Sequence, residues 1–279
     1  MTRPFRRPRG YTLFELIISM VLMGIVGAAI VRLIVYESRG FQAQDAAAEA
    51  RKAARAAVNL LNSELRMVDA TAGVSAASAT SITVRVPYAM GIACNNATVS
   101  TMPVDSLMFA QAVFGGYAWR DSLTGNYNYV TSGVTAGAGS SANCTGANIT
   151  TLTGGKIVAI GPILPAGGNW SVGTPVFLFQ TVQYAFAAST LLPGRRGLYR
   201  TVGSGTAEEI AAPFDSATSR FRFFVLNVDT SQAAVPASLA NIRGIELVFT
   251  GTSRSTPRGS TGPKKEAITT AVFSQNRID

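Results

Sequence analysis

The sequence predicts an α+β protein in which one long N-terminal helix, transmembrane in its first half, packs against a mainly antiparallel β-sheet head. Two observations carry this prediction. An apolar run near the N-terminus continues into an alanine-rich amphipathic segment, with no proline between Pro8 and Pro87 to interrupt a helix. From about residue 71 the chain changes to short β-branched and aromatic runs separated by Gly, Ser, Thr, Asn and Pro, which is the pattern of strands and turns.

The apolar run is long enough to cross a membrane. Residues 16–31 are apolar apart from Ser19, and Glu15 and Arg32 are the only charges between residues 11 and 36. As a helix, residues 11–36 extend ~39 Å, and a hydrocarbon core is ~30 Å thick. Four arginines and no acid precede the run, so the positive-inside rule places the N-terminus in the cytoplasm and the remaining chain outside it.

Glu15 is unexpected at the start of this run. An ionised carboxylate inside a membrane costs a few kcal/mol unless it is paired. A cleavable signal peptide, with "VGA" at residues 26–28 as its cleavage site, and a plain membrane anchor are both open interpretations of the run. Neither explains the carboxylate, which requires a positively charged partner.

The stretch "RGYTLFELI", residues 9–17, resembles the prepilin processing motif of type IV pilins and type II secretion pseudopilins. That motif combines a short basic leader, a glycine, an aromatic residue, a glutamate five positions after the cut and an apolar helix. The matching residues are Gly10, Tyr11, Thr12, Leu13 and Glu15. Tyr11 departs from the pattern, because it stands where phenylalanine is usual.

The resemblance implies a processing route and partners. A prepilin peptidase would cut between Gly10 and Tyr11 and methylate the new amine of Tyr11. Glu15 would be an assembly residue that pairs with the positively charged N-terminus of a neighbouring major or minor pilin or pseudopilin. Pairing with the Tyr11 amine of its own chain, about 6 Å away along the helix, is the alternative. The resemblance also implies a pilin-like fold, a location in the bacterial inner membrane with the head in the periplasm, and later assembly into a pilus or pseudopilus.

The chain divides into four segments on this interpretation. Residues 1–10 are the leader, 11–36 the transmembrane and assembly helix, 37–70 its amphipathic continuation, and 71–279 the β-rich periplasmic head. In the continuation, apolar residues recur at steps of three and four, which predicts one buried stripe and a solvated back. The predicted stripe is Ala47, Ala50, Ala54, Ala57, Leu61, Leu65 and Val68.

The head is expected to contain strands at residues 81–87, 104–114, 156–160, 175–186, 197–202, 220–228, 242–250 and 267–274. The segment 131–155 is rich in Gly, Ser, Thr and Asn and is predicted to be a polar loop.

The size and sequence of the head indicate which members of the superfamily this chain resembles most. Roughly 200 residues beyond the stem is large for a major subunit. The stretches "LNSELRMVDA", "GLYRTV", "FRFFV" and "AITTAVFSQNR" are similar to W-type minor pilins and to the related J-type pseudopilins. The resemblance therefore implies a minor pilin that primes or joins a type IV pilus, with a J-type pseudopilin of type II secretion as the alternative.

The two cysteines, Cys94 and Cys144, would both lie outside the cytoplasm, where a disulfide is favoured. A bridge between them closes about 50 residues and stabilises the head by ~4 kcal/mol in the chain-entropy model. Two unpaired buried thiols are the alternative.

A basic loop follows the strand predicted at 242–250. Its cations are Arg254, Arg258, Lys264 and Lys265. Such a cluster is able to meet nucleic-acid phosphates, but no aromatic residues stand between the cations to stack on bases. A solvated hairpin loop is the simpler interpretation.

Composition argues against an enzyme. Without the four leader arginines, 20 basic residues face 15 acidic ones, so the net charge falls from +9 to +5. Histidine, the commonest general base and metal ligand, is absent. We see no nucleophile–base pair, phosphate loop or cofactor motif, and we expect no catalytic residues, metal or cofactor. A membrane-anchored binding protein that never polymerises is the alternative of another class.

Overall fold

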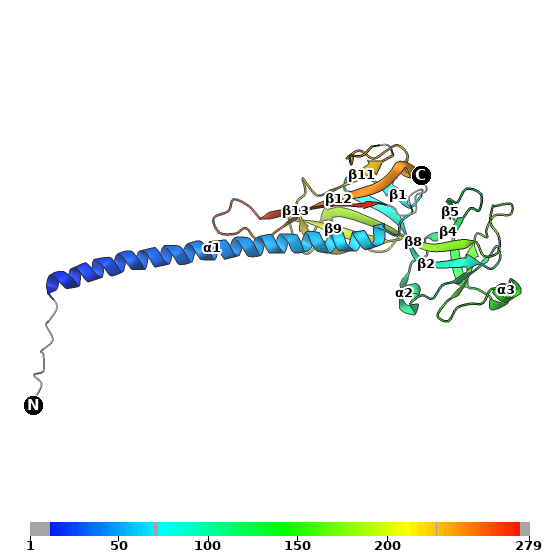
Figure 1. Ribbon diagram of the computed structural model, residues 1–279, viewed down its shortest axis with the longest axis horizontal. Helices are drawn as coiled ribbons and strands as arrows, with labels where there is room; N and C mark the ends of the chain where they lie inside the picture. The colour runs from blue at the N-terminus through cyan, green and yellow to red at the C-terminus, as the bar shows by residue number, and fades with distance from the viewer. Residues whose placement is uncertain (1–11, 70–71, 227, 274–279) are drawn as a thin grey trace, which may run out of the picture.

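The computed structural model describes residues 12–69, 72–226 and 228–273. Figure 1 shows one long helix, α1 (Leu13–Leu65), whose N-terminal half projects away from a β-rich head and whose C-terminal half lies along it. The head is one large sheet, and all its strand pairs are antiparallel. The predicted α+β class is confirmed.

Within the described residues the sheet has 13 strands, and its main path runs β11-β12-β10-β9-β8-β2-β3-β7-β6. The strands are β1 (Val74–Ala77), β2 (Ser81–Ala93), β3 (Thr98–Thr101), β4 (Gly116–Arg120), β5 (Tyr127–Val130), β6 (Thr135–Ala138), β7 (Ile157–Gly161), β8 (Pro175–Ala188), β9 (Arg196–Val202), β10 (Glu208–Phe214), β11 (Arg220–Val225), β12 (Ile242–Thr252) and β13 (Lys265–Phe273). Two short helices, α2 (Ser106–Gln111) and α3 (Ser141–Gly146), and the 3-10 turn η1 (Leu239–Asn241) complete the head.

Helix α1 buries a narrow face of small residues against the sheet. Its buried residues are Ala46, Ala50, Ala54, Ala57, Val58, Leu61 and Leu65. The predicted stripe is confirmed except at its start, where Ala46 rather than Ala47 faces the sheet. The helix ends at Leu65, short of residue 70, where the predicted amphipathic continuation ends.

Small residues let this helix lie directly on the backbone of β12. Gly251 of β12 faces Ala50, and a Cβ added to Gly251 would lie 2.0 Å from the Ala50 carbonyl oxygen. Ala50 and Ala54 are both completely buried there. Any side chain larger than hydrogen at residue 251 would therefore force the helix away from the sheet.

Two hydrophobic cores share the long central strands β2 and β8. We call the first the proximal core; it packs α1 residues such as Leu61 against Tyr184, Phe221 and Phe249 of the sheet. Aromatic rings meet edge to face within it, with the Phe186 and Phe249 centroids 5.2 Å apart.

The second, distal core lies beyond the end of α1. It contains Tyr117 and Trp119 of β4 with Leu164 and Leu178. Figure 1 shows β4, β5, α2 and α3 gathered at this far end of the head. Strands β2 and β8 pair from Ser81 opposite Ala185 to Ile92 opposite Pro175, so they run through both cores.

One predicted strand is wrong. Residues 104–114 contain α2 instead, because the Asp105 carboxylate accepts hydrogen bonds from the N–H groups of Leu107 (3.0 Å) and Met108 (2.9 Å) and caps a helix. The other seven predicted strands correspond to β2, β7, β8, β9, β11, β12 and β13, although residues 227 and 274 lie outside the described residues.

The structure also contains elements that were not predicted from the sequence. Segment 131–155 contains β6 and α3 as well as loop, so the loop prediction is wrong for these residues. All four residues of β6 are exposed, so no hydrophobic alternation marks it. Strands β1, β3, β4, β5 and β10 were likewise not predicted.

A partly buried ionic cluster holds the end of α1 on the sheet. Arg200 of β9 donates from Nη2 to Glu64 Oε1 at 2.9 Å, and the Tyr184 hydroxyl of β8 donates to the other oxygen of the same carboxylate. The side chains of Arg200 and Glu64 are 21% and 14% exposed. Burial, and then the Glu64 carboxylate, raise the pKa of the Tyr184 phenol.

We predict that Glu64→Gln lowers the free energy of unfolding by about 2 kcal/mol, because it leaves the Arg200 guanidinium unpaired in a largely dry site. Urea unfolding of the full-length chain in detergent, followed by near-ultraviolet circular dichroism, measures the effect. Asp229→Asn is the matched control: Asp229 pairs with Arg243 at 3.0 Å but its side chain is fully exposed, so we expect no measurable loss of stability. Equal losses in the two variants would contradict a structural role for the Glu64 cluster.

Candidate functional site

The N-terminus of α1 carries the residues that the prepilin motif singles out. Gly10 and Tyr11, the predicted cleavage and methylation positions, lie outside the described residues. Thr12 and Glu15 are described, and they form a capping box at the first turn of the helix. The geometry of Glu15 is therefore the structural starting point for the site.

The Glu15 carboxylate caps its own helix. Glu15 Oε2 accepts from the backbone N–H of Thr12 (3.0 Å) and from its hydroxyl (3.2 Å), and the Glu15 N–H donates to Thr12 Oγ1 at 3.3 Å. Within the described residues, Glu15 Oε1 accepts no hydrogen bond. The spacing Thr-x-x-Glu is a capping-box signal in the sequence, so this local role adds to the predicted assembly role of Glu15.

Apolar residues flank Glu15 in the sequence, and their side chains are exposed. Leu13 is 81% exposed and Phe14 is 71% exposed. The first part of α1 is long and apolar enough to cross a membrane, and none of its most apolar 18-residue window is buried against the head. This half of α1 is the surface available to lipid or to other helices.

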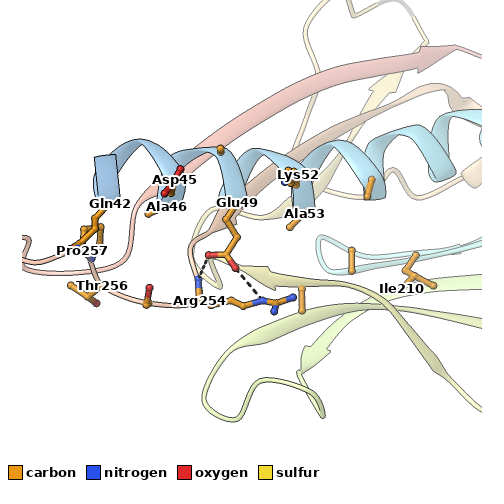
Figure 2. Close-up of a pocket in the computed structure, with 15 residues that line it drawn as sticks. Gln42, Asp45, Ala46, Glu49, Lys52, Ala53, Ile210, Arg254, Thr256 and Pro257 are labelled. Carbon is orange, nitrogen blue, oxygen red and sulfur yellow. Dashed lines mark hydrogen bonds and ion pairs between the residues drawn. The ribbon is translucent and has the colours of Figure 1, made fainter. Parts of the chain in front are cut away.

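The predicted basic loop folds back against α1. Figure 2 shows that the segment after β12 runs beside the helix, with Pro257 next to Gln42 and Arg254 reaching Glu49. The Arg254 N–H donates to Glu49 Oε2 at 3.0 Å, and Arg254 Nε lies 3.2 Å from Glu49 Oε1. A groove of about 810 Å³ lies between α1, β10 and this segment.

The four predicted cations do not form one patch. Arg254 is paired with Glu49. Lys265, the first residue of β13, is paired with Asp215. The pKa of the Asp215 carboxyl lies below its ordinary value. Burial alone would raise this pKa, but its hydrogen bonds, foremost the one from Lys265, and the charge of Lys265 together lower it by more. Among the described residues, Arg258 and Lys264 have no ion-pair partner.

Cys94 and Cys144 form a disulfide, as predicted, with their Cα atoms 4.7 Å apart. Cys94 directly follows β2, and Cys144 is the buried residue of α3. The bridge therefore fastens the polar segment 131–155 to the end of the central strands beside the distal core.

No group of three or more His, Cys, Asp or Glu side chains in the described part of the chain is arranged to hold a metal ion.

Residues 5–31 match the family described as a prokaryotic N-terminal methylation motif. No curated protein and no solved structure matches the chain. The motif, followed by a long apolar helix, fits the superfamily of type IV pilins and type II secretion pseudopilins. It implies processing by a prepilin peptidase and association with other pilins or pseudopilins, and it fits a single-pass inner-membrane anchor.

We predict that the double substitution Cys94→Ala and Cys144→Ala, which removes the disulfide, lowers the free energy of unfolding of the distal core by about 4 kcal/mol. The bridge joins residues 50 apart in sequence, so without it the unfolded chain gains conformational entropy. Both tryptophans of the chain, Trp119 and Trp170, lie in or against the distal core. Tryptophan fluorescence during urea unfolding therefore reports this core directly.

Hydrogen exchange of β11, β12 and β13 provides the control, because these strands pack in the proximal core. We expect their protection to be retained in the double variant. Equal loss of protection in both cores would mean that the head unfolds as one cooperative unit.

Proposed function

We propose that this protein is a minor pilin, anchored in the inner membrane as a precursor, processed by prepilin peptidase and assembled into or priming a type IV pilus. The observation that carries the proposal is the prokaryotic methylation motif at residues 5–31, directly on an apolar helix whose membrane-length half makes no contact with the head. On this proposal the protein acts by packing and does not turn over a substrate.

The two halves of α1 have separate tasks in this proposal. From Ala46 onward, one face of the helix packs against the sheet. That face is therefore not available for packing with the helices of other subunits. The half before Ala46 exposes apolar side chains throughout. Lipid covers this half before assembly, and neighbouring stems cover it in the filament, because so much apolar surface is unfavourable in water.

The size of the head supports a minor rather than a major subunit. A second core and the disulfide-linked segment extend the sheet well beyond the end of α1. Such an extension suits a subunit that occupies one special place in a filament. A J-type pseudopilin of type II secretion is the second candidate, and its chemistry would be the same.

Co-purification separates the two candidates. A minor pilin would be recovered with sheared pili, whereas a pseudopilin would be recovered with other pseudopilins and absent from pili. Recovery in neither fraction, with the chain intact in membranes, would favour a non-polymerising binding protein.

We predict cleavage between Gly10 and Tyr11 and methylation of the Tyr11 amine. Mass spectrometry of the mature protein from membranes should find an N-methylated tyrosine as its first residue. Gly10→Leu should leave the uncut precursor in the membrane. A mature terminus close to Ala29 would instead indicate an ordinary signal peptidase and would overturn the proposal.

We propose that the charge of Glu15, in addition to its capping role, drives assembly by pairing with the methylated amine of a neighbouring subunit. Oε1, which accepts no bond within the described residues, is the oxygen available for this. In an apolar setting such a pair is strong, and leaving one partner unpaired is costly.

Two substitutions separate the charge from the cap. Glu15→Gln keeps a capping box, since glutamine serves at this position, but removes the charge; we expect pilus incorporation to fall by about tenfold or more. Thr12→Val removes the hydroxyl of the cap and keeps the charge; it should weaken the first turn by ~1 kcal/mol and leave incorporation near normal. Quantitative immunoblotting of sheared pili, normalised to membrane levels, measures both. Normal incorporation of Glu15→Gln would restrict Glu15 to its capping role.

A further inference from the structure

The loop between β12 and β13, residues 253–264, has a defined shape. Its ends are joined by two hydrogen bonds: Ser253 N–H to the Lys264 carbonyl and Lys264 N–H to Ser253 Oγ, both 2.9 Å. Near its tip, Ser260 N–H donates to the Pro257 carbonyl at 3.0 Å, and Gly259 adopts a positive φ of 83° that favours glycine. We call this segment the β12–β13 loop.

The β12–β13 loop is fastened to α1. Arg254 pairs with Glu49, and Pro257 is buried in the groove beside Gln42 (Figure 2). A Cβ built on Gly259 would lie 4.0 Å from Arg39 Nη1, so the tip of the loop reaches the level of Arg39. Figure 1 shows the loop extending from β13 back along α1, toward the half of the helix that projects from the head.

This level lies close to the end of the apolar part of α1. The apolar run ends at Tyr36, which is 78% exposed, and tyrosine is typical of the membrane–water interface. The rise from Tyr36 to Arg39 is only ~5 Å. A charge at this level lies within one screening length of the lipid headgroups, which is ~8 Å at physiological ionic strength.

Two exposed cations, Arg39 and Arg258, and one exposed carboxylate, Glu37, lie at this level. Arg39 and Arg258 are exposed, and neither takes part in an ion pair within the described residues. The acidic groups nearest along α1 are Glu37 and Asp45, and Glu49 is already paired with Arg254. Gly259, the residue after Arg258, approaches the end of the Arg39 side chain, so the chain positions of the two arginines are close although they are far apart in sequence.

We infer that Arg39 and Arg258 form a binding site for the phosphate of anionic phospholipid headgroups. The planar guanidinium suits phosphate because it donates two parallel hydrogen bonds. Contact with headgroups would hold the head at a set height and tilt on the membrane before assembly. The inference rests on the membrane anchoring in the proposed function and adds a lipid partner to it.

Lipid fits this site better than nucleic acid does. The β12–β13 loop contains no aromatic side chain for base stacking, and two of the four cations predicted from the sequence are paired with carboxylates. A headgroup phosphate, in contrast, is supplied at the right level by the bilayer that α1 crosses.

The test uses the full-length protein with Thr261→Cys, an exposed residue of the loop. The two native cysteines are joined to each other, so a nitroxide spin label attaches to the new thiol alone. The protein is reconstituted in phosphatidylcholine vesicles with or without about 30% phosphatidylglycerol. The measurement is the collision rate of the label with nickel chelated on a lipid headgroup, divided by its collision rate with nickel dissolved in the buffer. A high value of this ratio means that the loop lies at the headgroups, and a low value means that it faces the solvent.

We expect this ratio to be high with phosphatidylglycerol and to fall about fivefold for each arginine removed, in Arg258→Gln and Arg39→Gln. High salt should also lower the collision ratio, because it screens the attraction between the arginines and the headgroups. Lys52→Gln is the matched control, since Lys52 is an exposed cation of α1 that lies ~24 Å beyond Tyr36, outside the screening length. Its ratio should equal that of the parent protein.

Each contrary outcome identifies what has failed. An equal ratio in vesicles with and without phosphatidylglycerol, or in Arg258→Gln and its parent, overturns the lipid site while leaving the proposed pilin function intact. A ratio that depends on the protein-to-lipid proportion means that the loop contacts another copy of the chain, which also overturns it. Failure of the protein to float with vesicles of either composition overturns membrane anchoring, and with it both the inference and the proposed function.

Discussion

The close contact between the alanine face of α1 and the backbone of β12 is the constraint on which the rest of the structure depends. Ala50 and Ala54 are completely buried there, and Gly251 has no room for a Cβ. Small side chains bring the helix near enough for Leu61 and Leu65 to enter the proximal core with the phenylalanines of the sheet. The Glu64 cluster then holds the last turn of the helix in place.

That contact also divides α1 into a buried and an exposed half, and this division links the fold to the proposed function. A helix packed along its whole length would have no surface left for a membrane or for other stems. Here the contact begins near Ala46, and the membrane-length part before it stays uncovered. The same contact places the β12–β13 loop beside the helix, because Arg254 and Pro257 lie within a few residues of the end of β12. The position of the loop tip near Arg39 is thus a consequence of how the sheet sits on the helix.

The distal core shows how the head is enlarged without disturbing the stem. Strands β2 and β8 are long enough to leave the proximal core and organise a second one around Tyr117 and Trp119. The disulfide from Cys94 to Cys144 fastens a polar segment that contributes little apolar surface of its own. Polar and small-residue segments are weakly held by burial, so a covalent link is a suitable way to fix one.

Features that depend on local or periodic signals could be predicted from the amino-acid sequence. These are the prepilin motif, the single long helix, its buried stripe from Ala50 onward, and the strands rich in β-branched and aromatic residues. The disulfide was predictable because only two cysteines exist and both were expected outside the cytoplasm. The tertiary structure decided what depends on partners distant in the chain: the short exposed strand β6, the helix capped by Asp105, and the division into two cores. The same packing brings Gly259 of the β12–β13 loop near Arg39 and pairs Arg254 with Glu49. No local pattern encodes such pairings, because they follow from how closely Gly251 lets the sheet approach the helix.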